Sequence, residues 1–297
     1  MNKIEKEPSH TYTSVAESVF QVERSAWNNC ANFIDDNRNI GNPFLSHEFF
    51  SCLEESGSVS KETGWISQHI LLFEEGNSLI GILPNYLKNH SWGEYIFDQV
   101  FANAWENAGG KYYPKLLSAI PFSPVAGERF LIKKGYSRKF VIEKLLDALE
   151  DLKKFYKVSS AHINFINEPQ LKIALKNKFW FERNNIQFHW SNQNYENFEH
   201  FLSKLSSSKR KTIRRERKEI HKSSILIDIV KNDEIKNYHS KIFYNFYLST
   251  IEKKWGGVYL NQKFWDLLIQ QLKNRIIFIL SKLDGEFIGG AINLIDQ

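Results

Sequence analysis

The sequence predicts an α/β (α+β) fold in which two similar units follow one another, each built on a mixed sheet flanked by helices. Three observations support this class. Segments with strand-like and helix-like periodicity alternate along the 297 residues, and one order of elements occurs twice. In addition, 42% hydrophobic and 14% aromatic residues are typical of an ordered globular chain rather than a disordered one.

The first unit, residues 13–195, is expected to follow a flexible tail at 1–12. Ser46 and Ser137 can each cap a helix, and residues 75–77 form a turn signal between two apolar segments. In order, the expected elements are a strand at 12–22, helices at 23–33 and 46–57, strands at 65–73, 78–87, 95–97 and 115–122, a long helix from 137, a strand at 161–166, a helix at 169–176 and an extended segment at 179–190.

A connecting region at 196–224 with two helices and a second unit at 225–297 are expected to follow. Serines at 206–208 can cap the second connecting helix, and Asp284-Gly285 is a strong signal for a two-residue hairpin turn. In order, the expected elements are an apolar-striped helix at 198–205, a basic helix over 209–218, a strand at 225–230, helices at 235–252 and 264–272, and hairpin strands at 275–283 and 287–294.

The order strand, helix, helix, strand, turn, strand occurs at 12–88 and again at 225–294. The two segments share little sequence, so the repeat is one of elements only, and coincidence is the alternative to two tandem units. The first copy continues into further strands and helices, whereas the second stops after its hairpin. Because a sheet that ends there would leave an unpaired strand edge, we expect the second unit to be incomplete.

Several classes of protein are excluded or disfavoured. The N-terminal segment MNKIEKEPSHTYTSV has no apolar run, which argues against a signal peptide, and no stretch of about 18 apolar residues predicts a transmembrane helix. The cysteines, Cys30 and Cys52, make neither a disulfide framework nor a zinc motif, so we expect buried thiols and no bound metal. A cytoplasmic location follows by default.

The positive charge is concentrated in one segment. Residues 209–218 hold seven basic residues and one acid, a net charge of +6, so the rest of the chain sums to −1 within the total of +5. Arginine forks bind phosphate oxygens in pairs, and a helix N-terminus adds partial positive charge, so this helix is a candidate phosphate site. A solvated surface helix is the alternative. The predicted phosphate-binding residues are Lys209, Arg210, Lys211, Arg214, Arg215, Arg217 and Lys218.

A set of strings points to a known family. In order, the chain contains PFLSHEFF, YLKNHSWGEYIFD, YYPKLLSAIPFSPVAG, QFHW, SSSKRKTIRRERKEI, FYLST and KKWGGVYL. Together they resemble a bacterial family of GNAT-like proteins, often labelled peptidoglycan biosynthesis or recognition proteins and related to the FemAB-type aminoacyltransferases. The resemblance covers most of the chain, from about Trp27 to its end. It implies tandem GNAT-like domains and transfer of an N-acyl, N-acetyl or aminoacyl group to an amine.

The resemblance also implies a co-substrate, acyl-CoA or aminoacyl-tRNA, and no tightly bound cofactor. GNAT enzymes hold the CoA pyrophosphate in a glycine-containing loop before a helix. The nearest match here has Lys133, Gly135 and Ser137 as candidate cofactor-binding residues, just before the helix expected from Ser137. An ordinary turn with a helix N-cap is the alternative for this loop. Relatives carry a further C-terminal segment.

Four residues are candidates for catalysis. His90 and Glu94, both in HSWGEY, can together accept a proton from an amine. Tyr247 in FYLST and Lys254 in KKWGG can donate hydrogen bonds to an oxyanion or a leaving group, although a helical tyrosine more often packs. The chain has no Ser-His-Asp order, HExxH, Walker loop or GxGxxG, which argues against covalent hydrolysis and nucleotide hydrolysis.

The favoured hypothesis is a GNAT-like N-acyltransferase that acts on an amine, such as one of a cell-wall precursor, and holds a phosphate-bearing molecule, CoA or tRNA on its basic helix. A nucleic-acid-binding protein that uses residues 209–218 is a second hypothesis, although the nearly neutral remainder of the chain argues against it. A non-catalytic recognition protein with the same fold is the third.

Overall fold

The computed structural model describes residues 5–33, 41–253 and 257–296. The described helices are α1 (Arg24–Ala31), α2 (His47–Glu55), α3 (Gln99–Asn107), α4 (Arg138–Tyr156), α5 (Glu168–Ala174), α6 (Phe198–Ser203), α7 (Ser207–Lys222), α8 (Asn237–Glu252) and α9 (Gln262–Leu272). The described strands are β1 (Thr11–Ala16), β2 (Trp65–Ser67), β3 (His69–Glu74), β4 (Ser78–Leu83), β5 (Tyr86–Lys88), β6 (Lys115–Ser118), β7 (Leu131–Ile132), β8 (Ala161–Ile163), β9 (Leu226–Lys231), β10 (Ile276–Leu283) and β11 (Glu286–Leu294).

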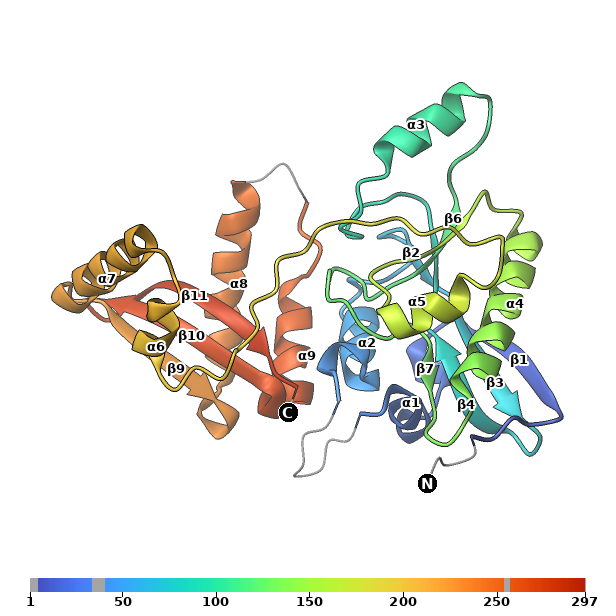
Figure 1. Cartoon of the computed structure of the whole chain (residues 1–297), viewed down its shortest axis with the longest axis horizontal. Helices are drawn as coiled ribbons and strands as arrows, with labels where there is room; N and C mark the ends of the chain where they lie inside the picture. Colours follow the sequence, from blue (N-terminus) through green and yellow to red (C-terminus); the bar gives the residue numbers. More distant parts are fainter. Residues whose placement is uncertain (1–4, 34–40, 254–256, 297) are drawn as a thin grey trace.

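Elements β1 to α5 form one half of the molecule, on the right in Figure 1, and α6 to β11 form the other. A long extended segment joins them, as the sequence predicts for 179–190. This mixed α/β architecture of sheets flanked by helices is the predicted fold class.

Most helix starts agree with their local signals. The Ser46 hydroxyl accepts the backbone N–H of Phe49 at 3.2 Å, and the Ser137 hydroxyl accepts that of Phe140 at 3.4 Å, so both predicted caps are confirmed. At the N-terminus, the Lys6 backbone bonds to Gly135 and Ser137 and β1 begins at Thr11, so part of the expected tail is held against the body.

The first sheet has the order β1-β3-β4-β7, with every neighbouring pair antiparallel. Alternation of side chains sends Ile70 and Leu72 of β3 into a core with α4, and Leu71 into a second core with α1 and α2. The sheet is therefore covered by helices on both faces.

The predicted strands at 65–73 and 78–87 each divide into two strands that belong to different sheets. β2 and β5 pair with one another and continue into β6 and β8, in the order β2-β5-β6-β8. The chain passes between the sheets at Gln68 and at Pro84-Asn85, where proline has no N–H for a ladder. The Asn85 N–H bonds instead to Nδ1 of His69, at 3.3 Å.

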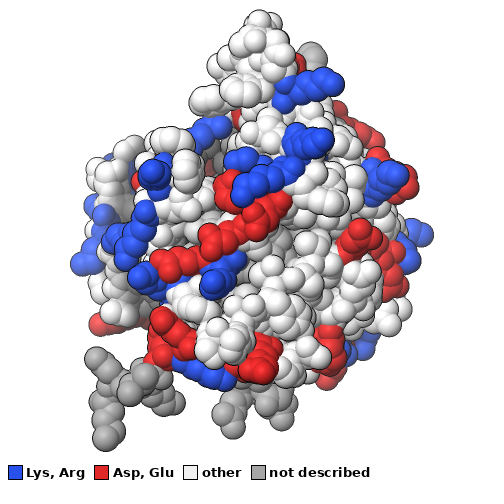
Figure 2. Space-filling view, turned by 90° about the vertical axis from the view of Figure 1, so that its right-hand side faces the viewer, with Lys and Arg blue, Asp and Glu red and all other residues white. Residues whose placement is uncertain are grey.

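The predicted strand at 95–97 is wrong. Tyr95 has a φ of 56° and Gly93 a φ of 79°, backbone conformations that interrupt a strand, and the segment is an irregular loop. The loop leads into α3, a helix that the sequence pattern did not predict. This helix buries Ala102 but otherwise projects from the top of the molecule in Figures 1 and 2.

In the second half, β9, β10 and β11 form an antiparallel sheet with β10 in the middle. The hairpin turn has φ values of 51° at Asp284 and 86° at Gly285, the left-handed pair that Asp-Gly favours. As in β1-β3-β4, the first strand pairs with the first strand of a following hairpin, after two helices. The repeated order of elements is thus present in both sheets, and the domain boundaries at 195 and 224 stay a prediction.

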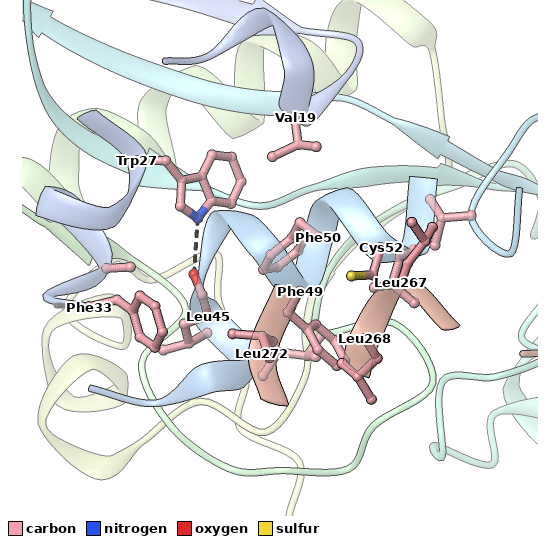
Figure 3. Close-up of a cluster of buried hydrophobic side chains, with 14 of the residues drawn as sticks. Val19, Trp27, Phe33, Leu45, Phe49, Phe50, Cys52, Leu267, Leu268 and Leu272 are labelled. Atoms are coloured by element: carbon pink, nitrogen blue, oxygen red, sulfur yellow. Dashed lines mark hydrogen bonds between the residues drawn. The ribbon is translucent and has the colours of Figure 1, made fainter. Parts of the chain in front are cut away.

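One hydrophobic core extends through both halves, because α2 packs against α9. The rings of Phe49 and Phe264 meet edge to face with centroids 6.0 Å apart, and Figure 3 shows leucines of α9 beside the phenylalanines of α2. Both cysteines lie in this core, and burial raises the pKa of each thiol to about 12, so neither is poised as a nucleophile.

Within the described ranges, no helix combines the length and the apolar character needed to cross a membrane. The same residues contain no group of three or more His, Cys, Asp or Glu side chains arranged to hold a metal ion.

Candidate active site

A buried group of charges lies where the second sheet meets the loop 89–98. The Lys115 ammonium donates to Glu94 at 2.8 Å, to Asp98 at 2.6 Å and to the Ser91 hydroxyl at 2.8 Å. Lys115, Glu94 and Asp98 are all nearly inaccessible to solvent. Tyr112 adds a hydrogen bond from its hydroxyl to Asp98, at 2.9 Å. One cation is therefore shared by two carboxylates in a low-dielectric setting.

The strand register explains why a second lysine joins this group. Lys88 on β5 lies directly opposite Lys115 on β6, and Trp65 on β2 lies opposite Lys88. The Lys88 ammonium sits 3.7 Å from the centre of the Trp65 ring and donates to the Trp92 carbonyl at 3.3 Å. Two like charges thus face one another across the sheet, an arrangement that needs the carboxylates of the loop 89–98 nearby.

Burial sets the protonation of this group. It lowers the pKa of Lys88 to about 7, an effect that Glu94 opposes and Lys115 reinforces. Burial also raises the pKa of Glu94, although Lys115 acts in the other direction. For Asp98, burial is outweighed by the hydrogen bonds from Lys115 and other donors, and its pKa is lowered. The pKa values of the two carboxylates therefore shift in opposite directions, and Glu94 is the one that takes up a proton more readily.

Two carboxylate oxygens in this group have no hydrogen-bond partner among the described residues, Oε1 of Glu94 and Oδ1 of Asp98. A buried acceptor without a donor costs about 1–3 kcal/mol, so each of these oxygens is destabilising unless it gains a hydrogen-bond donor.

His90 lies beside the group rather than within it. Its Nδ1 is 3.4 Å from the Lys88 ammonium, and its Nε2 is 3.0 Å from the Thr63 carbonyl. Burial, followed by the charge of Lys88, lowers the pKa of His90, which favours the neutral ring. The two predicted residues His90 and Glu94 are linked through Lys88, whose ammonium is 3.4 Å from His90 and whose charge interacts with that of Glu94.

Tyr247 approaches the same loop from the second half. Its hydroxyl accepts the backbone N–H groups of Tyr259 and Leu260, each at 3.2 Å, and burial raises its pKa. The Tyr259 ring stacks on Phe122 at 5.3 Å, and the Phe122 N–H donates to the carbonyl of Gly93 in the loop. Lys254 lies outside the described residues.

The predicted cofactor loop has its backbone groups engaged within the protein. The Ser137 N–H donates to the Lys6 carbonyl at 3.0 Å, and the Gly135 carbonyl accepts the Lys6 N–H at 2.8 Å. The Lys133 ammonium donates to the Ser78 hydroxyl at 3.0 Å. The pairing leaves fewer amides for a phosphate, and the binding role of Lys133, Gly135 and Ser137 stays a prediction.

The basic segment forms the middle of α7, which Ser206 caps by accepting the Lys209 N–H. No side chain of α7 is buried. Arg214 pairs with Glu199, and the Arg217 guanidinium lies 4.3 Å from the centre of the Phe198 ring. The helix occupies the left end of Figure 1, on the side of the second half away from β2 and β6.

The first half shows no comparable patch on the face drawn in Figure 2, where basic and acidic side chains are interspersed. This mixture agrees with the nearly neutral charge of the chain outside residues 209–218.

Sequence reasoning missed Lys88, Asp98 and Lys115. A usable signal was present, because Lys88 and Lys115 each lie in an apolar strand segment, YLK and KLLS. A lysine is rarely buried without a partner, so these positions call for nearby acids. Which acids pair with these lysines depends on the cross-strand register and on the path of the loop 89–98.

The comparison with protein families agrees with the resemblance. Residues 18–297 match the FemAB-like family, described as peptidoglycan biosynthesis/recognition. A search of curated proteins found no match. Because the family match spans nearly the whole chain, this protein belongs to the FemAB-like family, which implies a peptidoglycan-related, aminoacyl-transferase-type role.

Proposed function

We propose that the protein transfers an aminoacyl or acyl group to the amine of a cell-wall precursor, with Glu94 as the proton acceptor. The observation that carries this proposal is the buried carboxylate of Glu94, whose pKa burial raises and whose Oε1 has no partner among the described residues. An amine attacks a carbonyl only after losing its proton, and a partly basic carboxylate in a dry site can take it.

In the proposed step, the amine nitrogen forms a bond to the carbonyl carbon of the donor. The bond from that carbon to the ester oxygen or thioester sulfur breaks, and the leaving group departs with its electron pair. Glu94 accepts the proton of the amine and returns one to the leaving group. Lys115 holds Glu94 and Asp98 in place through its two ion pairs.

Tyr247 suits the role of hydrogen-bond donor in this step. Burial raises its pKa, so the hydroxyl keeps its proton, and its oxygen is fixed by two backbone N–H groups. A fixed O–H next to the reacting carbonyl can stabilise the developing oxyanion. His90, neutral and adjacent to Lys88, is proposed to relay a proton between Lys88 and the site.

We infer that the donor is carried by tRNA in preference to CoA. The support is the position of α7: none of its residues is buried, and in Figure 1 it lies on the side of the second half away from β6, whose Lys115 holds Glu94. A carrier that reaches both α7 and Glu94 has to extend across the molecule, which suits a long polyanion. Acyl-CoA at Lys133, Gly135 and Ser137 is the alternative.

Binding of a fluorescent tRNA, measured by anisotropy at several salt concentrations, tests the donor. Arg214→Ala with Arg215→Ala should weaken binding and reduce the salt slope by roughly 1–2. The matched control is Lys154→Ala with Lys172→Ala, which removes two exposed, ion-paired lysines from the first half. An equal loss of tRNA affinity in both double variants would exclude this donor site. Binding of acetyl-CoA without binding of tRNA would exclude it as well.

A further inference from the structure

Helix α3 projects from the first half with its apolar side facing solvent (Figures 1 and 2). The helix buries Ala102, whereas Val100 and Phe101 are 79% and 57% exposed. Trp105, one turn further on, is 52% exposed, and Phe97, in the loop that leads into the helix, is 76% exposed. The apolar stripe of a surface helix normally faces the core of a globular protein, so α3 has the reverse arrangement.

Helical geometry places these side chains on one stripe. At about 100° per residue, the exposed apolar residues of α3 fall within an arc of about 140°. They are Val100, Phe101, Ala104 and Trp105. Ala102 points about 130° away from the centre of this arc. The polar residues of the helix all lie outside the arc, so α3 is amphipathic with its apolar stripe directed to solvent. We call Phe97, Val100, Phe101 and Trp105 the apolar crest.

The projection is tied to the body at both ends. The hydroxyl of Tyr112, which follows the projection, donates at 2.9 Å to Asp98, the N-cap residue of α3. Within the projection, the Trp105 indole lies over the main chain at Gly110, where an added Cβ would stand 2.3 Å from Nε1. The Trp105 carbonyl also accepts the Gly110 N–H, at 3.0 Å. The crest is therefore presented by a closed loop whose ends are held together.

Basic side chains of the extended segment lie beside the crest. The Arg183 guanidinium donates to the Phe97 carbonyl at 2.7 Å and lies 4.8 Å from the centre of the Phe101 ring. The Lys178 ammonium lies 5.5 Å from the centre of the Phe179 ring, which is 70% exposed and lines one cavity together with Phe101. The rings of α3 and of this segment thus form one surface, with cations among them.

The charge of this surface is positive. Residues 99–111 and 176–183 hold four basic and two acidic residues, a net charge of +2. The basic residues are Lys111, Lys176, Lys178 and Arg183, and the acidic ones are Glu106 and Glu182. In Figure 2 the projection itself is mostly uncharged. An apolar crest with a surplus of cations beside it is complementary to a layer of anionic headgroups over hydrocarbon.

The residue types and the shape also favour a lipid surface over another protein. Tryptophan and other aromatic side chains concentrate at the boundary between headgroups and acyl chains. An amphipathic helix lies in this boundary with its apolar side buried by about 5–10 Å. A crest that projects from the body can enter a flat, fluid bilayer directly, whereas a protein partner would have to supply a matching groove.

We propose that α3 docks the protein on an anionic phospholipid membrane, with the apolar crest inserted at the level of the headgroups and the neighbouring basic side chains on their phosphates. The contact is peripheral. It goes beyond the proposed transfer reaction and does not depend on it, because its evidence is the exposure of the crest and the charge beside it.

Co-sedimentation of the full chain with vesicles tests the proposal. The vesicles contain equal parts of phosphatidylcholine and phosphatidylglycerol, and pure phosphatidylcholine vesicles are the comparison. Phe97→Ala with Val100→Ala should weaken binding to the mixed vesicles about tenfold, because two apolar side chains no longer enter the bilayer. The matched control is Ile227→Ala with Ile229→Ala on β9, which removes side chains that are 58% and 63% exposed from the second half. All four positions are exposed, so both variants are expected to fold, and their melting temperatures check this.

The basic helix α7 is a second cationic surface, so its contribution has to be separated from that of α3. In a chain that carries Arg214→Ala and Arg215→Ala, the crest substitutions should still weaken vesicle binding about tenfold, because independent contacts add. Vesicle binding that the α7 substitutions abolish and the crest substitutions leave unchanged would overturn the proposal and assign the membrane contact to α7.

Stronger binding to the mixed vesicles than to phosphatidylcholine, lost in the crest variant and retained in the β9 control, supports the docking surface. Absence of wild-type binding, or equal binding by the wild type and the crest variant, overturns it. A dimer that forms without vesicles and is lost in the crest variant, together with no vesicle binding, would also overturn it and show that a second copy covers the crest. None of these outcomes bears on the proposed transfer reaction, which Glu94→Gln tests separately.

Discussion

At the scale of single residues, the two buried lysines of the proposed site differ in their contacts. Lys115 keeps its ion pairs with Glu94 and Asp98, whereas Lys88 has a π-face and a carbonyl rather than a carboxylate as its contacts. Because burial acts on both Lys88 and Glu94, each is displaced toward its neutral form. Lys88 and Glu94 can therefore gain or lose a proton nearer to neutral pH, where ordinary lysines and glutamates stay charged.

Glu94→Gln should lower the transfer rate by about 10²–10⁴-fold, because glutamine cannot accept the amine proton. Initial rates across pH 5–9 are the measurement. The wild-type rate should rise with pH as Glu94 ionises, over a range above that of an ordinary carboxylate, since burial raises its pKa. The rate of the Glu94→Gln variant should not show this rise with pH.

Glu106→Gln, an exposed glutamate on α3, serves as the control and should keep the wild-type profile. Full activity of Glu94→Gln, with an unchanged melting temperature, would remove Glu94 from the mechanism.

Lys88 has a consequence for stability as well. Its pKa is about 7 in the folded protein and 10.5 for an unperturbed lysine, so between these values the unfolded chain binds more protons. The unfolding free energy should therefore rise with pH over this window, by roughly 1 kcal/mol per unit. Urea titrations at pH 7, 8.5 and 10 would show the slope reduced in Lys88→Met and retained in Lys154→Met, an exposed control. If Lys88→Met and the wild type had the same slope, the lowered pKa of Lys88 could not be the cause of the pH dependence.

At the scale of elements, packing across the first sheet depends on a glycine. A Cβ added to Gly81 on β4 would lie 2.5 Å from Cγ1 of Val141 and 3.3 Å from Cδ1 of Leu145, both on α4. The helix thus lies against the strand at a point that has no room for a side chain.

Gly81→Ala should destabilise the fold by about 1–3 kcal/mol, as overpacking of a buried contact does. Urea denaturation gives the value, and Val141→Ala in the same chain should recover part of the loss if the clash is the cause. Gly257→Ala is the control, since nothing lies within 4 Å of its added Cβ, and it should change stability by less than about 0.5 kcal/mol. A Gly81→Ala protein as stable as this control would show that α4 adjusts without cost.

The elements also show what local signals can predict. The helix from Ser137 and the hairpin at Asp284-Gly285 match their expected positions because a cap or a turn is specified by a few neighbouring residues. The division of two strands at Gln68 and at Pro84-Asn85 depends on which sheet each piece joins, and a sequence periodicity does not carry that information. His90 and Glu94 could be proposed together because they lie in one short segment, but the burial that mainly shifts their pKa values and the register that pairs Lys88 with Lys115 depend on the folded structure.

At the scale of the whole molecule, the two halves share a core although each has its own sheet. The α2–α9 contact is extended by polar bonds at its end, from the Asn261 side chain to the Ser56 carbonyl at 2.7 Å and from Lys263 to the Glu55 carbonyl at 2.8 Å. The loop 89–98 and Tyr259 make a further contact between the halves through Phe122. The proposed site thus draws residues from both halves, and its geometry depends on their fixed docking.

Phe264→Ala tests this coupling. Phe264 is buried between Phe49 and Trp265, with ring centroids 6.0 Å and 5.2 Å away, so its removal should cost about 3–5 kcal/mol. Because the core is continuous, we expect one unfolding transition whose midpoint falls equally by tryptophan fluorescence and by far-UV circular dichroism. Transfer activity should fall along the same curve. Two transitions, of which Phe264→Ala moves only one, would mean that the halves unfold separately, and the site between Glu94 and Tyr247 would then depend on a docking equilibrium rather than on a single folded core.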